Sequence, residues 1–159
     1  MVQALKAKMK EQKGFTLIEL LAVIVILGII AAIAIPAIGN VITKSDNKAK
    51  VQDALLIINA AKLYVADQRP TGNTILTVDG TTPATIYDTT ATTPTVASLD
   101  AYLDRVADKS FQVSVIPSLA SDGTTKYTYR LSNHDAVKVV NSSTDKTATV
   151  TEKKLSEYK

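Results

Sequence analysis

The sequence predicts an α+β fold in which a long N-terminal helix packs, through its second half, against a small antiparallel β-sheet. Three observations predict this fold. A nearly charge-free apolar block runs from Phe15 to Ile42, an amphipathic helical pattern follows it, and short β-like runs separated by turn signals fill the remainder. The 159 residues allow about one compact domain with an appendage.

The composition narrows the classes of function. The chain has one His and no Cys, which excludes disulfides, thiolate metal sites and cysteine nucleophiles and argues against a multi-histidine zinc site or a His-based triad. Of the 18 basic side chains, four lie in residues 1–14 beside a single glutamate. Residues 15–159 then hold 14 basic and 14 acidic side chains, so the net charge of +3 belongs to the N-terminal leader.

The apolar block is long enough to span a membrane. From Leu20 to Ile35 no side chain is polar. A helix from Phe15 to Ile38 would be roughly 36 Å long, against a hydrocarbon core of about 30 Å and a usual secretory apolar region of about 7–15 residues. The lysines before the block predict a cytoplasmic leader and an external C-terminal part.

Glu19 is the only charged residue of the block. A carboxylate in a membrane segment costs about 2–4 kcal/mol and normally has a partner or a route to water. A nearby cation would relieve this cost, or Glu19 reaches the cytoplasmic interface and has no specific role. Gly28 and Ala32 form a small-xxx-small pair that suits close helix packing or simply a permissive apolar helix. Pro36 deprives the Ala32 carbonyl of its partner and should kink or loosen the helix.

The segment Lys13-Gly14-Phe15-Thr16-Leu17-Ile18-Glu19 resembles the prepilin signature of type IV pilins and the related pseudopilins. A basic leader ends in Gly, and Phe-Thr-Leu-Ile-Glu leads directly into the apolar helix. The resemblance holds to about Ile38. It implies that a membrane aspartyl peptidase cleaves Gly14–Phe15, that residues 1–14 are removed, and that Phe15 becomes the N-methylated terminus of a 145-residue chain.

The resemblance also implies a role for Glu19 in assembly. Cleavage frees the α-amino group of Phe15, which is cationic for much of the time at neutral pH. In the family, such a carboxylate neutralises the terminal amine of a neighbouring subunit, whereas the sequence also permits pairing within one chain. The implied partners are other copies in a helical filament, the prepilin peptidase and methyltransferase, the assembly platform and minor pilins, and the membrane before assembly; no cofactor is implied.

The expected organisation has four segments. They are the cleaved leader (1–14), an apolar membrane and filament-core helix (15–42), its amphipathic continuation (43–69) and a globular Thr-rich β head (70–159). The continuation buries a stripe made of Val51, Ala54, Leu55, Ile58, Ala61 and Val65. Arg69-Pro70-Thr71-Gly72 ends the helix. Because a helix over 15–68 would span roughly 80 Å, its first half is expected to project as a stalk.

The head is expected to contain a short helix over Ser98–Val106 capped by Ser98, and a surface loop over Thr81–Thr95. The expected strands are Thr74–Val78, Ser110–Ile116, Lys126–Leu131, Ala136–Val140 and Lys146–Thr151. The last four would form an antiparallel meander, with turns at residues 121–123, 132–135 and 141–143.

The head shows no catalytic or metal-binding pattern. His134 is predicted in a solvated turn, and Ser132 is too close in sequence to form a triad with it alone. The carboxylates of Asp122, Asp135 and Asp145 could offer oxygens to calcium, but without EF-hand spacing they are better interpreted as turn residues. A second acidic set comprises Asp100, Asp104 and Asp108, which would share one face of the expected short helix. Because Arg105 and Lys109 accompany them, this face is interpreted as a solvated surface.

The absence of cysteine departs from family members of many diderm bacteria, which close the C-terminal part of the head with a disulfide. The absence of cysteine favours a pilin from a monoderm bacterium or from another cysteine-free lineage. Packing or a metal would then have to hold the C-terminal part of the head. Residues 70–159 carry nine basic and ten acidic side chains, so the head has no global electrostatic footprint for DNA, and only local patches at Lys126 with Arg130 or at the C-terminal lysines remain.

The expected function is structural, not enzymatic. The chain is predicted to be the major pilin of a type IV pilus that serves adhesion or twitching motility. One alternative is a major pseudopilin or competence pilin in a pseudopilus for secretion or DNA uptake. The alternative from another class is a single-span, membrane-anchored extracellular binding domain.

Overall fold

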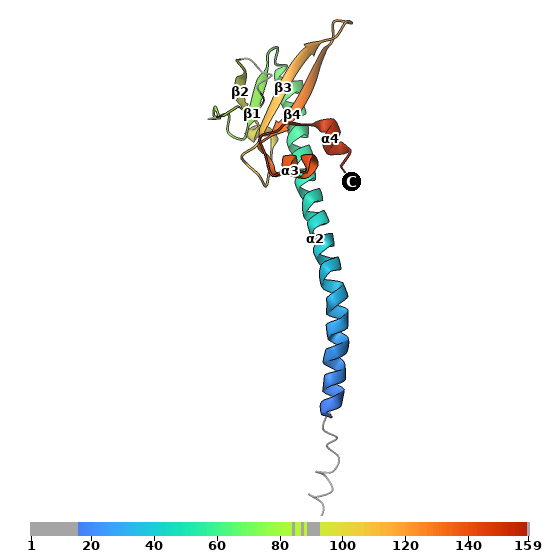
Figure 1. Ribbon diagram of the computed structural model, residues 1–159. Coiled ribbons are helices and arrows are strands. Elements are labelled where there is room, and N and C mark those ends of the chain that lie inside the picture. Colours follow the sequence, from blue (N-terminus) through green and yellow to red (C-terminus); the bar gives the residue numbers. More distant parts are fainter. Residues whose placement is uncertain (1–15, 84, 87, 89–92, 159) are drawn as a thin grey trace, which may run out of the picture. The chain divides into compact units, whose positions relative to one another are not determined.

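The computed structural model describes residues 16–83, 85, 86, 88 and 93–158. Figure 1 shows the fold coloured along the sequence, with most of the elements labelled. In chain order, the elements are α2 (Leu17–Gln68), β1 (Thr74–Thr77), β2 (Thr95–Ser98), the 3-10 helix η1 (Asp100–Tyr102), β3 (Gln112–Leu119), β4 (Thr125–Ser132), α3 (Asp135–Asn141), β5 (Val150–Thr151) and α4 (Glu152–Ser156). The chain divides into two compact units, residues 1–44 and 45–159, and α2 contributes to both.

The described part of the first unit is the N-terminal portion of α2. From Leu17 to Ile42 its large apolar side chains are 46–83% exposed. By length and composition α2 can cross a membrane. Pro36 lies inside the helix, which continues on both sides of it.

The second unit contains the rest of α2 and a five-stranded sheet in the order β2-β1-β3-β4-β5. The pairs β1–β3, β3–β4 and β4–β5 are antiparallel, but β1 and β2 are parallel. The predicted antiparallel sheet is therefore a mixed sheet. The two parallel strands are joined by the long connection 78–94, as parallel strands require.

The core of this unit lies between α2 and the sheet. The predicted stripe of α2 is buried at Val51, Ala54, Ile58, Ala61 and Val65 and half-buried at Leu55, and Ile57 adds to it. Residues of the sheet and its connections that complete the same core are Leu76, Leu99, Phe111, Val113, Val115 and Leu131. As predicted, α2 ends before Arg69-Pro70, where Arg69 adopts a φ of 46°.

Two predicted elements differ in type. Ala136–Val140, expected as a strand, lies in helix α3, because His134 caps the helix and Ala136 and Val137 bury one side of it. This packing overrides the β-preference of the valines. The helix expected over Ser98–Val106 shrinks to η1, since Ser98 ends strand β2. Its hydroxyl still accepts the Asp100 N–H at 3.0 Å.

Other predicted boundaries shift. Strand β2 was not predicted, because Thr95 falls in the expected loop and Ser98 in the expected helix. The strand expected over Lys146–Thr151 is reduced to the two residues of β5. The turn at 121–123 joins β3 to β4 as predicted, whereas the turn at 132–135 leads into α3. Part of the loop expected over 81–95 lies outside the described residues.

Candidate functional site

The N-terminal end of α2 is closed by a reciprocal pair of hydrogen bonds. The Thr16 N–H donates to Glu19 Oε2 at 2.7 Å, and the Glu19 N–H donates to Thr16 Oγ1 at 3.3 Å. The Thr16 hydroxyl also donates to Oε2, at 2.9 Å. This arrangement is a capping box, in which two side chains satisfy helix-end N–H groups. Gly14 and Phe15, the predicted cleavage and methylation residues, lie outside the described part of the chain.

The predicted packing residues of the apolar segment are all exposed. Gly28, Ala32 and Pro36 lie on the surface of α2. A Cβ at Gly28 would meet nothing within 4 Å. The small-xxx-small pair is therefore not covered by any described part of the chain, which leaves it available to another helix.

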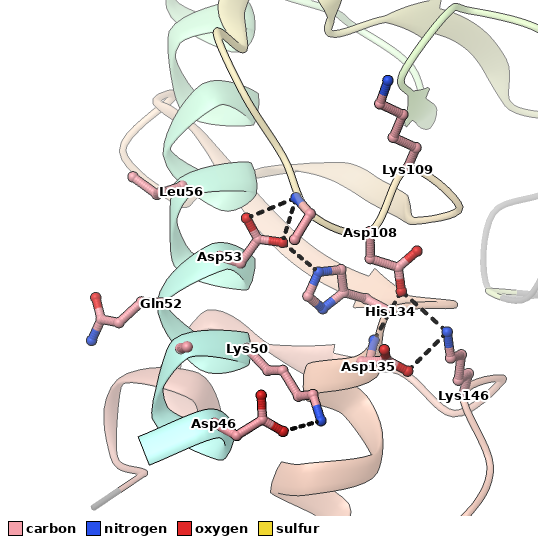
Figure 2. A pocket seen from close by; sticks show the side chains of 12 residues that line it. Asp46, Lys50, Gln52, Asp53, Leu56, Asp108, Lys109, His134, Asp135 and Lys146 are labelled. Carbon is pink, nitrogen blue, oxygen red and sulfur yellow. Dashed lines mark hydrogen bonds and ion pairs between the residues drawn. The ribbon is translucent and has the colours of Figure 1, made fainter. Parts of the chain in front are cut away.

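The second unit contains a cavity of about 870 Å³, shown in Figure 2. It lies between α2, the connection that follows η1, and the turn that precedes α3. Its lining residues are Asp46, Ala49, Lys50, Gln52, Asp53, Leu56, Ala107, Asp108, Lys109, His134, Asp135 and Lys146.

His134, predicted in a solvated turn, is buried at the base of this cavity with 1% of its surface exposed. Its Nδ1 accepts the Ala136 N–H at 3.0 Å and caps α3. Because Nδ1 needs a free lone pair for this bond, the proton of the neutral ring belongs on Nε2. Nε2 then donates to Asp53 Oδ2, 3.1 Å away. Each ring nitrogen forms a hydrogen bond inside the fold, so both polar atoms of the buried imidazole are satisfied.

Asp53 lies on α2 beside the buried stripe, and none of the predicted sites includes it. Besides His134, its carboxylate accepts the Ala107 N–H at 3.2 and 3.3 Å. It therefore joins α2 to the connection before β3 and to the turn before α3. No sequence signal could have found this pair, since 81 positions separate the two residues.

Asp108 is a second polar centre. Its carboxylate accepts hydrogen bonds from Ser110, from the Asp135 N–H at 3.2 Å and from Lys146 Nζ at 3.1 Å. Burial would raise the pKa of Asp108, but the hydrogen bonds of Ser110 and Lys146 outweigh it and hold the pKa at about 2. Lys146 also pairs with Asp135 Oδ1 at 2.9 Å, and this hydrogen bond lowers the pKa of Asp135 and raises that of Lys146.

The predicted turn aspartates Asp122 and Asp145 each bond within their own turn. Asp122 accepts from Thr124, and Asp145 accepts from Thr147. These bonds hold both pKa values below the usual range. Among the described residues, no group of three or more His, Cys, Asp or Glu side chains is placed to hold a metal ion.

The polar residues that line the cavity hold neighbouring elements of the fold together. Its lining contains no hydroxyl or thiol that the His134–Asp53 pair could activate as a nucleophile. Ser132 is buried and donates to the Gln112 carbonyl at 3.4 Å. The acidic set Asp100, Asp104 and Asp108 does not share a helix face, since η1 ends at Tyr102.

Comparisons with known proteins locate a family motif at the N-terminus. Residues 9–35 match the family described as prokaryotic N-terminal methylation motif. Type II secretion system core protein G of Vibrio cholerae is 40% identical over 60 residues, which are 38% of this chain and 41% of the relative. The fimbrial protein of Moraxella nonliquefaciens is 44% identical over 64 residues, covering 40% of this chain and 39% of the relative.

A third relative, type IV major fimbrial protein FimA of Dichelobacter nodosus, is 38% identical over 71 residues, covering 45% of this chain and 42% of the relative. The chain spans about two fifths of the length of these curated relatives. No solved structure gives a significant match. The methylation motif and these relatives show that the N-terminal two fifths of the chain is similar to the corresponding part of type IV pilins and of type II secretion pseudopilins.

Proposed function

We propose that this chain is the precursor of the main structural subunit of a type IV pilus. A prepilin peptidase cuts between Gly14 and Phe15, the Phe15 amine is methylated, and mature subunits leave the membrane to form a helical surface filament for adhesion or motility. One observation carries this proposal. The first part of α2 is apolar and exposed from Leu17 to Ile42, and residues 17–35 of it lie within the matched motif.

The exposed apolar surface needs a non-aqueous environment at every stage. Burial of apolar surface stabilises by about 25 cal/mol per Å², so this segment favours the bilayer before assembly and the apolar helices of other copies afterwards. A contact that joins different surfaces of identical subunits does not close on itself and therefore generates an open filament. The basic residues of the leader orient the precursor with residues 1–14 in the cytoplasm and the head outside.

Glu19 supplies the counter-charge for assembly. Both Thr16 donors bind Oε2, so Oε1 receives no hydrogen bond from the described residues and can face a cation. In the proposed filament this cation is the Phe15 amine of a neighbouring copy. Neutralisation is worth more in an apolar filament core than at a wet surface, because the effective dielectric constant is lower.

The role of the head is structural. Its cavity holds a His–Asp pair whose ring nitrogens both serve the fold. The His134–Asp53 hydrogen bond and the Lys62–Glu152 ion pair, with Nζ and Oε1 2.5 Å apart, hold the C-terminal elements to α2. The chain has no cysteine, so no disulfide contributes.

A secretion or competence pseudopilus is the second candidate function. It is supported by the relatives named type II secretion system core protein G, such as that of Vibrio cholerae, which is 40% identical over 60 residues where the fimbrial protein of Moraxella nonliquefaciens is 44% identical over 64. A pseudopilin would be processed identically but would not form long surface filaments. A membrane-anchored extracellular binding domain would instead keep residues 1–14 and remain a monomer in detergent.

The deciding experiment is mass spectrometry of material sheared from the native host, with electron microscopy of the same fraction. Long filaments whose subunits begin at N-methylated Phe15 are expected. Correct processing without long filaments would favour the pseudopilin. Intact residues 1–14, retained in the membrane, would overturn both filament functions.

A further inference from the structure

The buried His134 uses its two ring nitrogens in opposite roles. Nδ1 accepts the Ala136 N–H at 3.0 Å, whereas Nε2 donates to Asp53 Oδ2 at 3.1 Å. In a neutral imidazole, the nitrogen that accepts a hydrogen bond is also the atom that takes up a proton, because both uses require the same lone pair. A proton on Nδ1 therefore removes the acceptor of the Ala136 N–H and leaves the bond to Asp53 in place.

The cavity of about 870 Å³ brings the ring close to the surface of the head. His134 is 1% exposed, yet it is one of the residues that line this cavity, and Figure 2 shows its ring directed at Asp53. A proton can therefore reach the ring from the cavity side without passing through the apolar core between α2 and the sheet.

Charged side chains from every neighbouring element line the same cavity. They are Asp46, Lys50 and Asp53 from α2, Asp108 and Lys109 from the connection before β3, Asp135 from α3, and Lys146 from the connection before β5. Four carboxylates thus face three ammonium groups while the ring is neutral. One additional positive charge on the imidazole balances this set, so the surrounding field favours protonation.

We propose that the head contains an acid-sensitive switch, in which a proton on His134 Nδ1 releases the first turn of α3 while Asp53 keeps the ring attached to α2. Histidine is the side chain whose ordinary change of charge falls between about pH 5 and pH 8, so mild acid is the signal. The switch is a property of the head and does not depend on the proposed filament.

The released N–H group cannot stay where it is. In the protonated ring, the Nδ1–H and the Ala136 N–H point at each other as two donors. Ala136 is fully buried, and a buried backbone N–H requires an acceptor. The start of α3 must therefore move until this N–H meets water or another acceptor. Because α3 has only 7 residues, it depends on its cap and its packing and not on its own helix propensity.

The neighbouring carboxylates of the turn hold their charge through this change. Burial would raise the pKa of Asp108, but the hydrogen bonds of Ser110 and Lys146 hold it at about 2. The hydrogen bond of Lys146 lowers the pKa of Asp135. Neither carboxylate therefore titrates in mild acid. The Asp135 N–H also keeps its bond to Asp108 Oδ2 at 3.2 Å, which confines the movement to the positions after Asp135.

The test uses the full chain in detergent micelles. His134 is the single histidine, so isotope-labelled histidine gives one unambiguous set of ring nitrogen signals by NMR. At about pH 7.5 we expect a neutral ring with its proton on Nε2. On acidification to about pH 5, Nδ1 should become protonated, and exchange of the Ala136 amide, corrected for its intrinsic dependence on pH, should rise about tenfold. Amides in β3 should keep their protection.

The matched variant is His134→Asn. Asparagine is a favoured cap residue, and its amide oxygen accepts a hydrogen bond without titrating. Protection of the Ala136 amide in this variant should be the same at both pH values. An acid-induced loss as large as that of the unsubstituted chain would show that the ring is not the switch.

Three results on the unsubstituted chain, which need no variant, would overturn the proposal. The ring stays neutral down to about pH 5, or it becomes protonated while the Ala136 amide keeps its protection. In the third result, protection is lost in α3 and β3 together, which is global acid unfolding and not a local switch. None of these results bears on processing or filament formation, which are measured separately.

Discussion

His134 and Asp53 lie 81 positions apart in the sequence, and a 3.1 Å hydrogen bond joins the imidazole Nε2 to the carboxylate. The other ring nitrogen caps α3, and the carboxylate also accepts the Ala107 N–H. One buried ring therefore couples α2, the connection before β3 and α3. In a chain without cysteine, this coupling helps to hold the C-terminal part of the head to the long helix.

Substitution of Asp53 should loosen this junction. In Asp53→Ala, His134 Nε2 and the exposed Ala107 N–H both lose their acceptor, and leaving the buried His134 ring unsatisfied costs about 1–3 kcal/mol. We expect the free energy of unfolding to fall by that amount, measured by urea denaturation of the full chain in non-ionic detergent with near-UV circular dichroism. The matched control is Asp46→Ala, which removes only an exposed pair with Lys50 and should cost under about 0.5 kcal/mol. Equal effects would contradict the role of the junction.

Acid should lower the folding stability of the head by protonating Asp108. Its pKa is about 2 in the folded chain, below its ordinary value of 3.8, so the stabilisation is present above about pH 4 and is lost as the pH falls toward 2. The difference between the two pKa values corresponds to about 2 kcal/mol of folding free energy. Asp108→Asn should be less stable than the unsubstituted chain at pH 7 by about this amount and nearly equal to it at pH 2. Urea midpoints at both pH values measure the effect, and a constant difference would refute it.

A side chain at Gly80 should destabilise the head. It has a φ of 73°, and a Cβ would approach the Ser98 Cβ and backbone N to 3.1 Å each. Gly80→Ala therefore combines left-handed strain with a steric conflict against β2 and should cost about 2–4 kcal/mol. Gly123→Ala is the control, since its φ is 82° but nothing lies within 4 Å, and about 1 kcal/mol is expected. Thermal unfolding of the two variants should separate the two contributions.

Glu19→Gln separates the charge of Glu19 from its capping role. The amide oxygen can still accept the Thr16 N–H, but it carries no charge to neutralise a terminal amine. We expect normal cleavage after Gly14, retention in the membrane and at least about a tenfold loss of sheared filaments.

The control for Glu19→Gln is Thr16→Ala, which removes the Thr16 hydroxyl from the capping box and keeps the charge. It should cost about 1 kcal/mol at the helix end and leave filaments present. Filaments of Glu19→Gln in normal amounts would show that the charge is not needed for assembly.

Local patterns were sufficient to predict the long helix and its end. The apolar run, the stripe from Val51 to Val65 and the Arg69-Pro70 stop are each encoded within a few turns of the chain, and the structure confirms them. The resemblance of residues 13–19 to the prepilin signature has the same local character, and the matched motif confirms it.

The head depended on contacts that the sequence does not display. Ala136–Val140 reads as a strand by propensity, yet the cap by His134 and the burial of Val137 make it a helix. Strand β2 pairs in parallel with β1, and its own four residues carry no distinctive pattern. The sequence by itself determined the N-terminal methylation motif and the apolar helix, because both depend on residues that are close together in the chain. Tertiary structure alone decided the burial of His134 and its pairing with Asp53, because a hydrogen bond between distant residues forms only after the chain has folded them together.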